Sequence, residues 1–338
     1  MPELPEIFQA LTNPKAYPEK TQIIQLIQTQ MSFVFLTDNY VYKVKKPVNL
    51  GYLDYTTLEK RHILCQREVE LNRRLCPEVY LGVVPIIRDK GNISIEGQGE
   101  IIEYAVKMRR LPQDQMMDIL LAKNQVSLQM ITKVAQKMAE FHKQAKTNAD
   151  ISAFGNLDII NRNTEENFSQ TQKYIGKTIS GEVYQHIKSY TDNFIKQNGS
   201  LFQQRITNSK IKDNHGDLHA AHICFTKNGI CIYDCIEFND RFRYCDVASE
   251  VAFLAMDLDH YGHHDLSRNF VNSYIIQSGD EELRQLLNFY KCYLAYVRGK
   301  VEGFKLDDPY IPKGEKERIL GIARDYFKLA ESYVSEKK

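Results

Sequence analysis

The pattern of apolar and polar residues divides the chain into a strand-rich part followed by a helical part. Residues 32–36 and 40–44 are rich in β-branched and aromatic side chains, and Thr37-Asp38-Asn39 between them is typical of a hairpin turn. Similar runs predict three more strands, at residues 83–87, 92–96 and 101–107. We therefore expect residues 31–107 to form an antiparallel sheet with one inserted helix.

The inserted helix is expected over residues 56–75, opened by a capping box at Thr56-x-x-Glu59. Glu68 falls on the apolar stripe of this helix, where a carboxylate is costly unless a basic group meets it. Burying the charge of Lys43 on an otherwise half-buried strand is costly in the same way. An ion pair between Lys43 and Glu68 would offset both costs. Lys45 lies on the same strand face and is the alternative to Lys43.

The rest of the chain reads as helical, apart from a β-hairpin around Asn228-Gly229. The predicted helices lie at residues 116–122, 128–142, 182–196, 247–258, 266–276, 281–301 and 316–334. Residues 144–180 are polar and predict a connecting excursion, and residues 1–30 predict a helical extension with Ile23, Ile24 and Ile27 on one face. The expected fold class is α+β, with an extension at 1–30, a small lobe at 31–107 and a helical lobe at 108–338.

Composition narrows the class of protein without naming a function. The chain has 338 residues and a net charge of +1, which gives no general case for nucleic acid or an anionic membrane. It holds no run of eighteen apolar residues and no signal-peptide pattern at its start, so no membrane partner is expected. The seven cysteines are odd in number and form no Cys-x-x-Cys, so we expect reduced thiols and a cytoplasmic location.

Titratable residues concentrate in Asn214–His222 and in the strand that ends at Asp234. Gly216 permits an unusual backbone next to Asp217. Paired carboxylates at loop and strand ends hold Mg²⁺ and orient a hydroxyl nucleophile. Asp217 and Asp234 are therefore the first candidates for catalysis and metal binding.

A zinc-dependent hydrolase is a second interpretation of the same stretch. His215, His219 and His222 are spaced by four and three residues and, with Asp234, offer a set of zinc ligands. Gly216 and Asp217 interrupt a regular helix there, and no H-E-x-x-H is present, so this interpretation is the weaker one.

Several charged or polar residues follow Asp234 closely and have two open interpretations. Glu237, Asn239, Arg241 and Arg243 either line the substrate side of a cleft or brace the loop. Asp246 is predicted to cap the helix at 247–258 or to anchor the loop at 214–222, and not to touch a ligand.

His215-Gly216-Asp217-Leu218-His219 with Asp234 resembles the catalytic core of the aminoglycoside phosphotransferase and choline kinase group, within the protein-kinase-like fold. An uncharacterised bacterial branch of that group, whose members are named "aminoglycoside phosphotransferase family enzyme", is more similar still, over about residues 10 to 330. The matching segments are Asn214–His222, Tyr233–Tyr244, Asp246–Ala248, Val41–Pro47, Leu71–Leu75 and Tyr80–Pro85.

The resemblance implies a two-lobed kinase-like fold with ATP bound near Met108. Asp217 resembles the residue that accepts or orients the substrate hydroxyl proton, and Asp234 the Mg²⁺-binding aspartate. Lys43 resembles the lysine that neutralises the nucleotide phosphates, and Glu68 the glutamate that pairs with it. The implied reaction is transfer of the ATP γ-phosphoryl group to a hydroxyl of a small molecule, with ATP and Mg²⁺ as cofactors.

Two positions depart from the group's pattern. His222 stands where an asparagine is the usual second metal ligand, and imidazole suits Mn²⁺ better than Mg²⁺. Thr37-Asp38-Asn39 replaces the glycine-rich phosphate loop. A pseudokinase that binds nucleotide without transfer therefore remains an alternative. Some members of the branch carry a fused P-loop kinase domain, but G-x-x-x-x-G-K-[ST] is lacking here and we expect the first module only.

Overall fold

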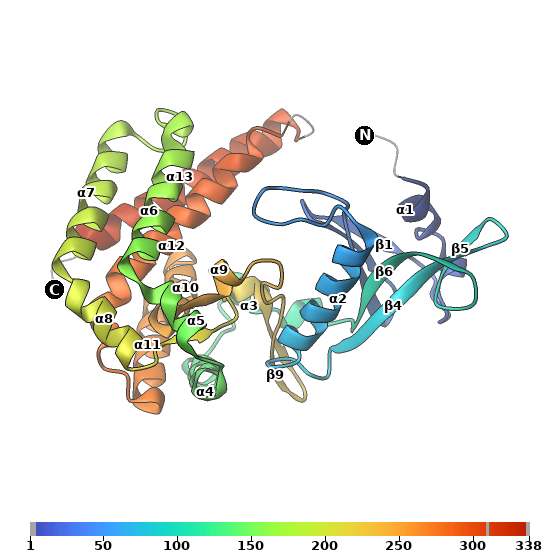
Figure 1. Ribbon diagram of the computed structural model, residues 1–338, viewed down its shortest axis with the longest axis horizontal. Coiled ribbons are helices and arrows are strands. Elements are labelled where there is room, and N and C mark those ends of the chain that lie inside the picture. Colours follow the sequence, from blue (N-terminus) through green and yellow to red (C-terminus); the bar gives the residue numbers. More distant parts are fainter. Residues whose placement is uncertain (1–4, 309–310, 336–338) are drawn as a thin grey trace. The chain divides into compact units, whose positions relative to one another are not determined.

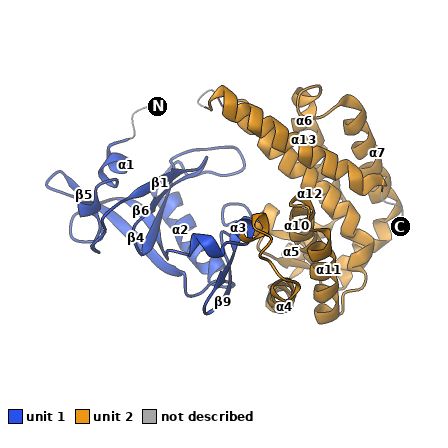
Figure 2. Ribbon diagram, turned by 180° about the vertical axis from the view of Figure 1, so that it is seen from behind, with its two compact units in different colours: residues 1–119, 221–240 blue, residues 120–220, 241–338 orange. Residues whose placement is uncertain are grey.

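The computed structural model describes residues 5–308 and 311–335, which form two compact units. The first unit comprises residues 1–119 and 221–240, and the second comprises residues 120–220 and 241–338 (Figure 2). The expected lobes had a single boundary at residue 108, whereas here the hairpin segment 221–240 returns to the first unit.

A six-stranded antiparallel sheet forms the first unit, in the order β1-β2-β3-β6-β4-β5 (Figure 1). Its strands are β1 (Gln25–Gln28), β2 (Ser32–Leu36), β3 (Tyr40–Lys45), β4 (Tyr80–Asp89), β5 (Asn92–Ile95) and β6 (Glu100–Arg109). The five strands expected from residue 32 onward are confirmed. In the pairing of β3 with β6, Lys43 lies opposite Val106.

Side-chain alternation gives the sheet two different faces, because successive residues of a strand point to opposite sides. Tyr42 and Val44 of β3 are buried in one apolar cluster with Phe8 of the short helix α1 (Glu6–Ala10). Lys43 and Lys45 point to the other face, where helix α2 (Leu58–Asn72) lies against the sheet (Figure 1). The predicted single face for the two lysines is therefore confirmed.

The start of α2 differs from the expected capping box. The N-cap is Thr57, whose side chain accepts a hydrogen bond from the backbone NH of Lys60 at 3.2 Å. The hydroxyl of Thr56 instead donates to Asp54 at 2.6 Å. The prediction of a cap at Thr56 was wrong by one residue, because the two adjacent threonines offer the same chemistry and the preceding chain decides between them.

The expected helical extension is wrong for residues 25–28. Helix α1 and the 3-10 helix η1 (Pro14–Ala16) are present, but residues 25–28 form strand β1, paired antiparallel with β2. Ile23 and Ile27 are exposed at 74% and 43%, so they form no buried helical face. The free edge of β2 offered backbone hydrogen bonds that a short helix could not match.

The second unit is mainly helical, as expected. Its helices of eight or more residues are α4 (Leu128–Gln144), α6 (Leu157–Thr171), α7 (Gly181–Gln197), α8 (Gly199–Thr207), α10 (Val247–His260), α11 (His264–Ser278), α12 (Leu283–Lys305) and α13 (Lys313–Ser335). Helix α10 is buried along nearly its whole length. Helices α12 and α13 lie side by side in Figure 1. Residues 144–180 were expected to form an irregular connection, but they contain helix α6. Phe168 of this helix packs into the core although its neighbours in sequence are polar.

Short elements complete the two units. Helix α3 (Met117–Ala122) follows the 3-10 helix η2 (Gln113–Gln115), and helix α5 (Ala149–Ser152) is followed by η3 (Ala153–Gly155). The remaining short helices are η4 (Gln172–Tyr174), η5 (Ala220–His222) and α9 (Asp240–Arg243). Strand β7 (Ile211–Asp213) pairs with β10 (Tyr244–Asp246), and β8 (Ile223–Thr226) pairs with β9 (Gly229–Ile232), which confirms the hairpin at Asn228-Gly229.

A disulfide joins Cys76 to Cys231, with 4.8 Å between their Cα atoms. The expectation of reduced cysteines is therefore wrong for Cys76 and Cys231. The two residues are 155 positions apart in sequence, and their approach depends on the packing of β9 within the first unit. The other cysteines are thiols: Cys65, Cys224, Cys235, Cys245 and Cys292.

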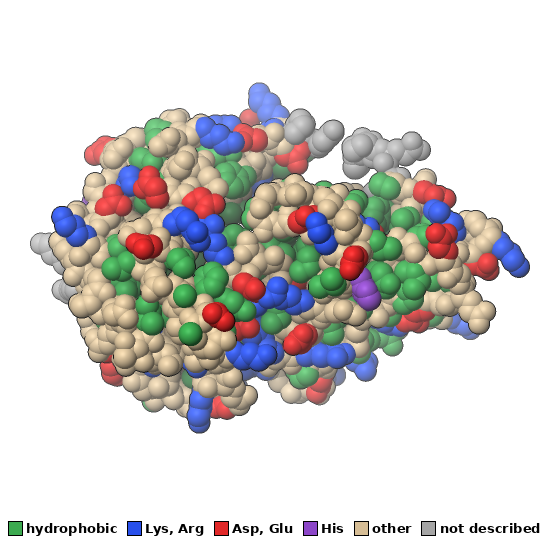
Figure 3. All heavy atoms as spheres, in the orientation of Figure 1, with side chains coloured by type: hydrophobic (Ala, Val, Ile, Leu, Met, Phe, Trp, Pro, Cys, Tyr) green, Lys and Arg blue, Asp and Glu red, His purple; other side chains and the backbone are tan. Residues whose placement is uncertain are grey.

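Charged side chains of both signs are interspersed over the face seen in Figure 3, in keeping with the small net charge. Among the helices in the described part of the chain, none combines the length and apolarity needed to cross a membrane.

Candidate active site

Lys43 of β3 contacts two carboxylates in the first unit. Its Nζ lies 2.9 Å from Oε1 of Glu68 on α2 and 2.6 Å from Oδ1 of Asp234. Burial alone would lower the pKa of Lys43, but the carboxylates of Asp234 and Glu68 outweigh it and hold the pKa well above its usual range. The lysine is therefore a fixed cation between the helix and the segment after β9.

Lys45 is buried more deeply and contacts a second glutamate. Its Nζ lies 2.6 Å from Oε2 of Glu68 and forms an ion pair with Glu237, which also accepts a hydrogen bond from the hydroxyl of Tyr55 at 2.6 Å. Burial would raise the pKa of Glu237, but Lys45 and then Lys43 lower it, so this carboxylate is ionised.

Glu68 therefore joins two lysines, one with each carboxylate oxygen. Together with Asp234 and Glu237 it gives a cluster of two cations and three anions. The residual charge of this group is one negative unit, which favours a neighbouring cation.

The Asp234 backbone lies in the left-handed region, with φ of 63°. Aspartate tolerates this conformation better than most residues do, because its short polar side chain can bond locally. The NH of Asp234 donates to the hydroxyl of Tyr80 at 3.2 Å, and the NH of Cys235 donates to Asn72 at 2.9 Å. These contacts turn the chain sharply after β9, and the Asp234 side chain stays 40% exposed.

His222 approaches the same aspartate. Its Nε2 lies 3.5 Å from Oδ2 of Asp234, the oxygen opposite to the one that contacts Lys43. The NH of Tyr233 donates to the backbone carbonyl of His222 at 3.0 Å, which ties the two strand ends together. His222 and Asp234, predicted separately as metal ligands, are thus brought together within the first unit.

The loop around Asp217 belongs to the second unit and is held by helix α10. The NH groups of His215 and Gly216 donate to Oε1 of Glu250 at 2.9 and 2.7 Å. The NH of Ala220 donates to Oδ2 of Asp257 at 2.8 Å. Glu250 and Asp257 are seven residues apart, hence on one helix face, so two turns of α10 grip both ends of the loop.

Glu250 is itself supported from the side. It accepts a hydrogen bond at 2.8 Å from Nε2 of His142 on α4, and Nδ1 of that ring lies 2.8 Å from the hydroxyl of Tyr274. Burial would raise the pKa of Glu250, but the hydrogen bond and charge of His142 hold it below its usual range. The carboxylate is therefore ionised, which strengthens its bonds to the loop NH groups.

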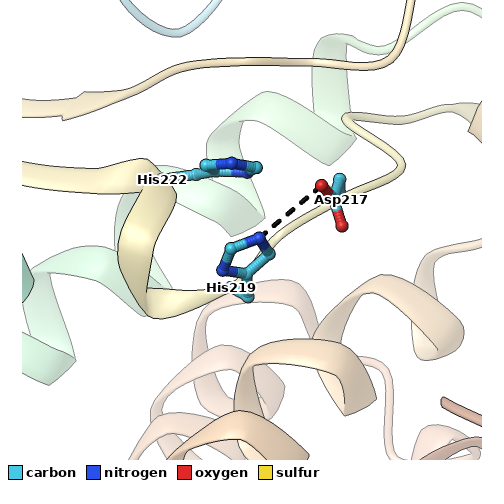
Figure 4. A group of neighbouring side chains, drawn as sticks. All are labelled: Asp217, His219 and His222. Atoms are coloured by element: carbon cyan, nitrogen blue, oxygen red, sulfur yellow. Dashed lines mark ion pairs between the residues drawn. The ribbon is translucent and has the colours of Figure 1, made fainter. Parts of the chain in front are cut away.

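Asp217 projects from this loop with a half-buried side chain. Its Oδ2 lies 3.6 Å from Nε2 of His219, the ion pair drawn in Figure 4. Burial would lower the pKa of His219, but Asp217 raises it above its usual value. The NH of Asp217 donates to Nδ1 of His215 at 3.2 Å, and His215 is fully buried, so His215 shapes the loop.

The polar residues after Asp234 contact other secondary-structure elements and loops of the protein. Asn239 donates to the carbonyl of Tyr52 at 3.0 Å in the first unit. In the second unit, Arg241 pairs with Glu166 on α6, and the buried Arg243 pairs with Asp213 of β7 at 2.5 Å. These contacts match the bracing interpretation, which the sequence left open beside a substrate-lining one.

Asp246 caps α10, one of the two roles predicted for it, and its other contact is with Arg205 of α8 and not with the loop at 214–222. Its side chain accepts from the NH of Ala248 at 2.8 Å, as the N-cap of α10. It also binds the buried guanidinium of Arg205 through two hydrogen bonds, at 2.7 and 2.9 Å. Asp280 shares that guanidinium. Met108 lies near the end of β6, opposite Val41 and Tyr80, and is 8% exposed.

Three contributors to the site were not assigned from the sequence. Lys45 was considered only as a rival of Lys43, whereas both lysines bind Glu68. Glu250 and Asp257 were overlooked, although two carboxylates inside an apolar helix are a signal of buried partners. Which backbone groups they would meet depends on how α10 packs, and the sequence pattern does not specify this.

Comparison with solved structures identifies the fold. Over 95% of this chain and 91% of the other, the structure superimposes on a choline kinase from Cryptosporidium parvum with a TM-score of 0.52 and 12% identity. A choline/ethanolamine kinase family protein from Mesorhizobium loti gives 0.52, with 10% identity over 97% of this chain and 98% of the other. A Ralstonia eutropha protein named provisionally as an aminoglycoside phosphotransferase gives 0.52, at 12% identity over 93% of each chain.

The chain therefore has the protein-kinase-like α+β fold of the choline kinase and aminoglycoside phosphotransferase group, as its motifs predicted. Uncharacterized proteins from Mycobacterium tuberculosis and Mycobacterium bovis are 34% identical over 279 residues, which is 82% of this chain. The chain spans 54%, about half, of the length of these curated relatives. No family model matches the chain.

Proposed function

We propose that the protein is a phosphotransferase that moves the γ-phosphoryl group of ATP to a hydroxyl of a small molecule. The observation that carries this proposal is the contact of Lys43 with both Glu68 and Asp234. A lysine held between a helix glutamate and a metal-binding aspartate is the arrangement that positions nucleotide phosphates in kinases. The choline kinase among the fold neighbours supports a small-molecule acceptor.

The residues of the first unit fit a nucleotide with its metal. Asp234 offers carboxylate oxygens, which Mg²⁺ prefers, and the ionic cluster around it retains a net negative charge. Lys43 would neutralise phosphate oxygens while Glu68 keeps its ammonium oriented, with the nucleotide near Met108. The metal would neutralise charge that develops on the phosphate oxygens. His222 adds a nitrogen donor beside Asp234, which suits Mn²⁺ better than Mg²⁺.

Asp217 would receive the proton of the acceptor hydroxyl. In the reaction, the bond from the γ-phosphorus to the β–γ bridging oxygen breaks. A bond from the acceptor oxygen to that phosphorus forms, and the hydroxyl proton passes to the Asp217 carboxylate. His219 lies beside this carboxylate, at 3.6 Å. Glu250 and Asp257 hold the loop, so that Asp217 needs little reorganisation.

The test is phosphoryl transfer from labelled ATP to a panel of hydroxyl compounds, compared between the wild type and Asp217→Asn. We expect Asp217→Asn to lower the rate by about 10²- to 10⁴-fold, the usual contribution of a general base. Its affinity for nucleotide should be unchanged. Asp265→Asn, at an exposed position of α11, is the matched control.

Four results would contradict the proposal or one of its residue assignments. Nucleotide binding without any transfer by the wild type would identify a pseudokinase, and transfer that persists in Asp217→Asn would remove the role of that residue. Stoichiometric zinc in the purified protein would instead support a hydrolase. Unchanged affinity for Mg²⁺-ATP in Asp234→Ala would refute the assignment of the metal ligand.

A further inference from the structure

Arg298 is a cation of the second unit that the reaction above does not use. It lies in the middle of α12 and is half-buried. Its guanidinium carbon lies 5.6 Å from the ring centroid of Tyr326 on α13, within the range of a cation–π contact. Its Nε atom is buried and has no hydrogen-bond partner within the described residues.

Two aspartates attract this guanidinium from a longer distance. Asp217 and Asp257 both act electrostatically on Arg298, yet among residues 5–308 and 311–335 no carboxylate forms an ion pair with it. Asp257 already binds the NH of Ala220. Burial alone would lower the pKa of Arg298, but Tyr326, Asp217 and Asp257 raise it, so the group is a permanent cation.

An arginine in this state is a receptor for an oxyanion. Its guanidinium presents NH donors in a planar fork that matches a carboxylate or a phosphate, and one of those donors is buried without a partner. Leaving a buried donor unmet is unfavourable, so a ligand that meets it gains binding free energy. Tyr326 supports the group from one side, and the ring of His260 stacks on Tyr326 with 3.9 Å between ring centroids.

We propose that Arg298 is a specificity-determining residue that binds an oxyanion of the acceptor, whose hydroxyl is directed to Asp217. The acceptor is then a small hydroxy compound that carries a carboxylate or a phosphate, and not a cationic amino alcohol or a neutral sugar. This inference rests on the proposed phosphotransferase function. In this inference one short acceptor molecule reaches both residues, with its hydroxyl at Asp217 and its anionic group at Arg298.

The experiment compares acceptors that share a hydroxyl frame and differ in charge: glycerol, glycerate, glycerol 3-phosphate and ethanolamine. With labelled ATP we expect one of the two anionic compounds to exceed glycerol in kcat/KM by about 10- to 100-fold, the value of a charge-assisted hydrogen bond. The two anionic arms distinguish a carboxylate from a phosphate. Equal or better transfer to glycerol or ethanolamine would overturn the inference.

Variants at Arg298 separate binding from bracing. Arg298→Gln should remove the preference for the anionic acceptor, mainly through a higher KM, so that kcat/KM falls much more for the anionic acceptor than for glycerol. Arg298→Lys keeps the charge and should retain part of the preference. Arg284→Gln, which removes an exposed arginine at the start of α12, is the control for net charge. A preference that survives Arg298→Gln in folded protein would refute the role of Arg298.

A binding measurement distinguishes failure of this inference from failure of the phosphotransferase proposal. Thermal shifts with glycerate and glycerol 3-phosphate, without nucleotide, should stabilise the wild type and Arg284→Gln but not Arg298→Gln. If that pattern holds without any transfer, the anion site stands and the proposed reaction fails. If transfer occurs but neither anion stabilises the wild type, the anion site fails and the reaction stands. Should Arg298→Gln fail to fold, Arg298→Lys takes its place: it keeps the charge but loses the planar fork, and should weaken the anion shift.

Discussion

Buried carboxylates serve two different purposes in the two units. In the first, Glu68 and Glu237 bind the side chains of Lys43 and Lys45. In the second, Glu250 and Asp257 bind backbone NH groups of the loop that carries Asp217. The first is a network of ion pairs between side chains, whereas the second is a clamp on the main chain.

The difference matters for chemistry. A network of lysines and carboxylates can redistribute its contacts when a phosphate or a metal ion approaches, because each ion has more than one partner. A clamp on backbone NH groups fixes the position of the loop. The side chain of Asp217 is then influenced only by the residues around it. The first unit is thus built to receive charge, and the second to hold one carboxylate in place.

The largest expected effect comes from breaking the clamp with Glu250→Ala. The substitution removes the acceptor of two loop NH groups, one on the buried His215 and one on the half-buried Gly216, and the partner of the buried His142. Removing one partner of a buried charge pair costs about 3–5 kcal/mol, and we expect that loss in the free energy of unfolding, measured by urea denaturation. Glu250→Gln keeps the shape of the side chain and should lose less.

The control for this variant is Glu140→Ala on α4. Glu140 is exposed, so its replacement should change the free energy of unfolding by less than about 0.5 kcal/mol. A similar loss in both variants would show that Glu250 is not a clamp.

Within the first unit, Lys45→Met and Lys43→Met should separate stability from nucleotide binding. Lys45 is 1% exposed and its loss leaves Glu237 buried beside one remaining lysine, so we expect a destabilisation of about 3 kcal/mol. Lys43 is more exposed and Asp234 is open to solvent, so Lys43→Met should cost about 1 kcal/mol. Nucleotide affinity, measured by titration calorimetry, should fall mainly in Lys43→Met.

The reverse result would exchange the roles of the two lysines. If Lys45→Met abolished nucleotide binding while remaining as stable as the wild type, Lys45 and not Lys43 would be the residue that meets the phosphates. Hydrogen exchange of α2 amides reports on the same packing, because Glu68 anchors that helix to both lysines.

The sequence predicted those parts of the site that follow from periodicity. Strand alternation placed Lys43 and Lys45 on one face, and the helical repeat placed Glu68 on the stripe that meets it. The cost of lone buried charges then predicted the contact of Lys43 with Glu68, which the structure shows. The fold class followed from the succession of strands and helices.

The remainder depended on tertiary context. Strand β1 forms because the edge of β2 was available, which the isolated pattern of Ile23 and Ile27 did not reveal. Helix α6 is polar over most of its surface, so its periodicity is weak. The partners of Glu250 are backbone groups, and a backbone NH leaves no signature in the sequence.

The smallest expected effect concerns pH and the pair of Asp217 with His219. The pKa of His219 is raised in the folded state, so this pair stabilises the fold fully below the unfolded value of 6.5 and loses its contribution as pH rises through the folded pKa. His219→Gln should therefore be less stable than the wild type near pH 6 by at most about 1 kcal/mol, and the gap should close above the folded pKa. Thermal denaturation across pH 5.5 to about 9 measures this dependence. The double variant with Asp217→Asn is the decisive control, because the pH-dependent part of the His219→Gln effect must vanish when its partner is neutral. If the difference in stability between His219→Gln and the wild type stayed constant with pH, packing and not the charge of His219 would hold the loop.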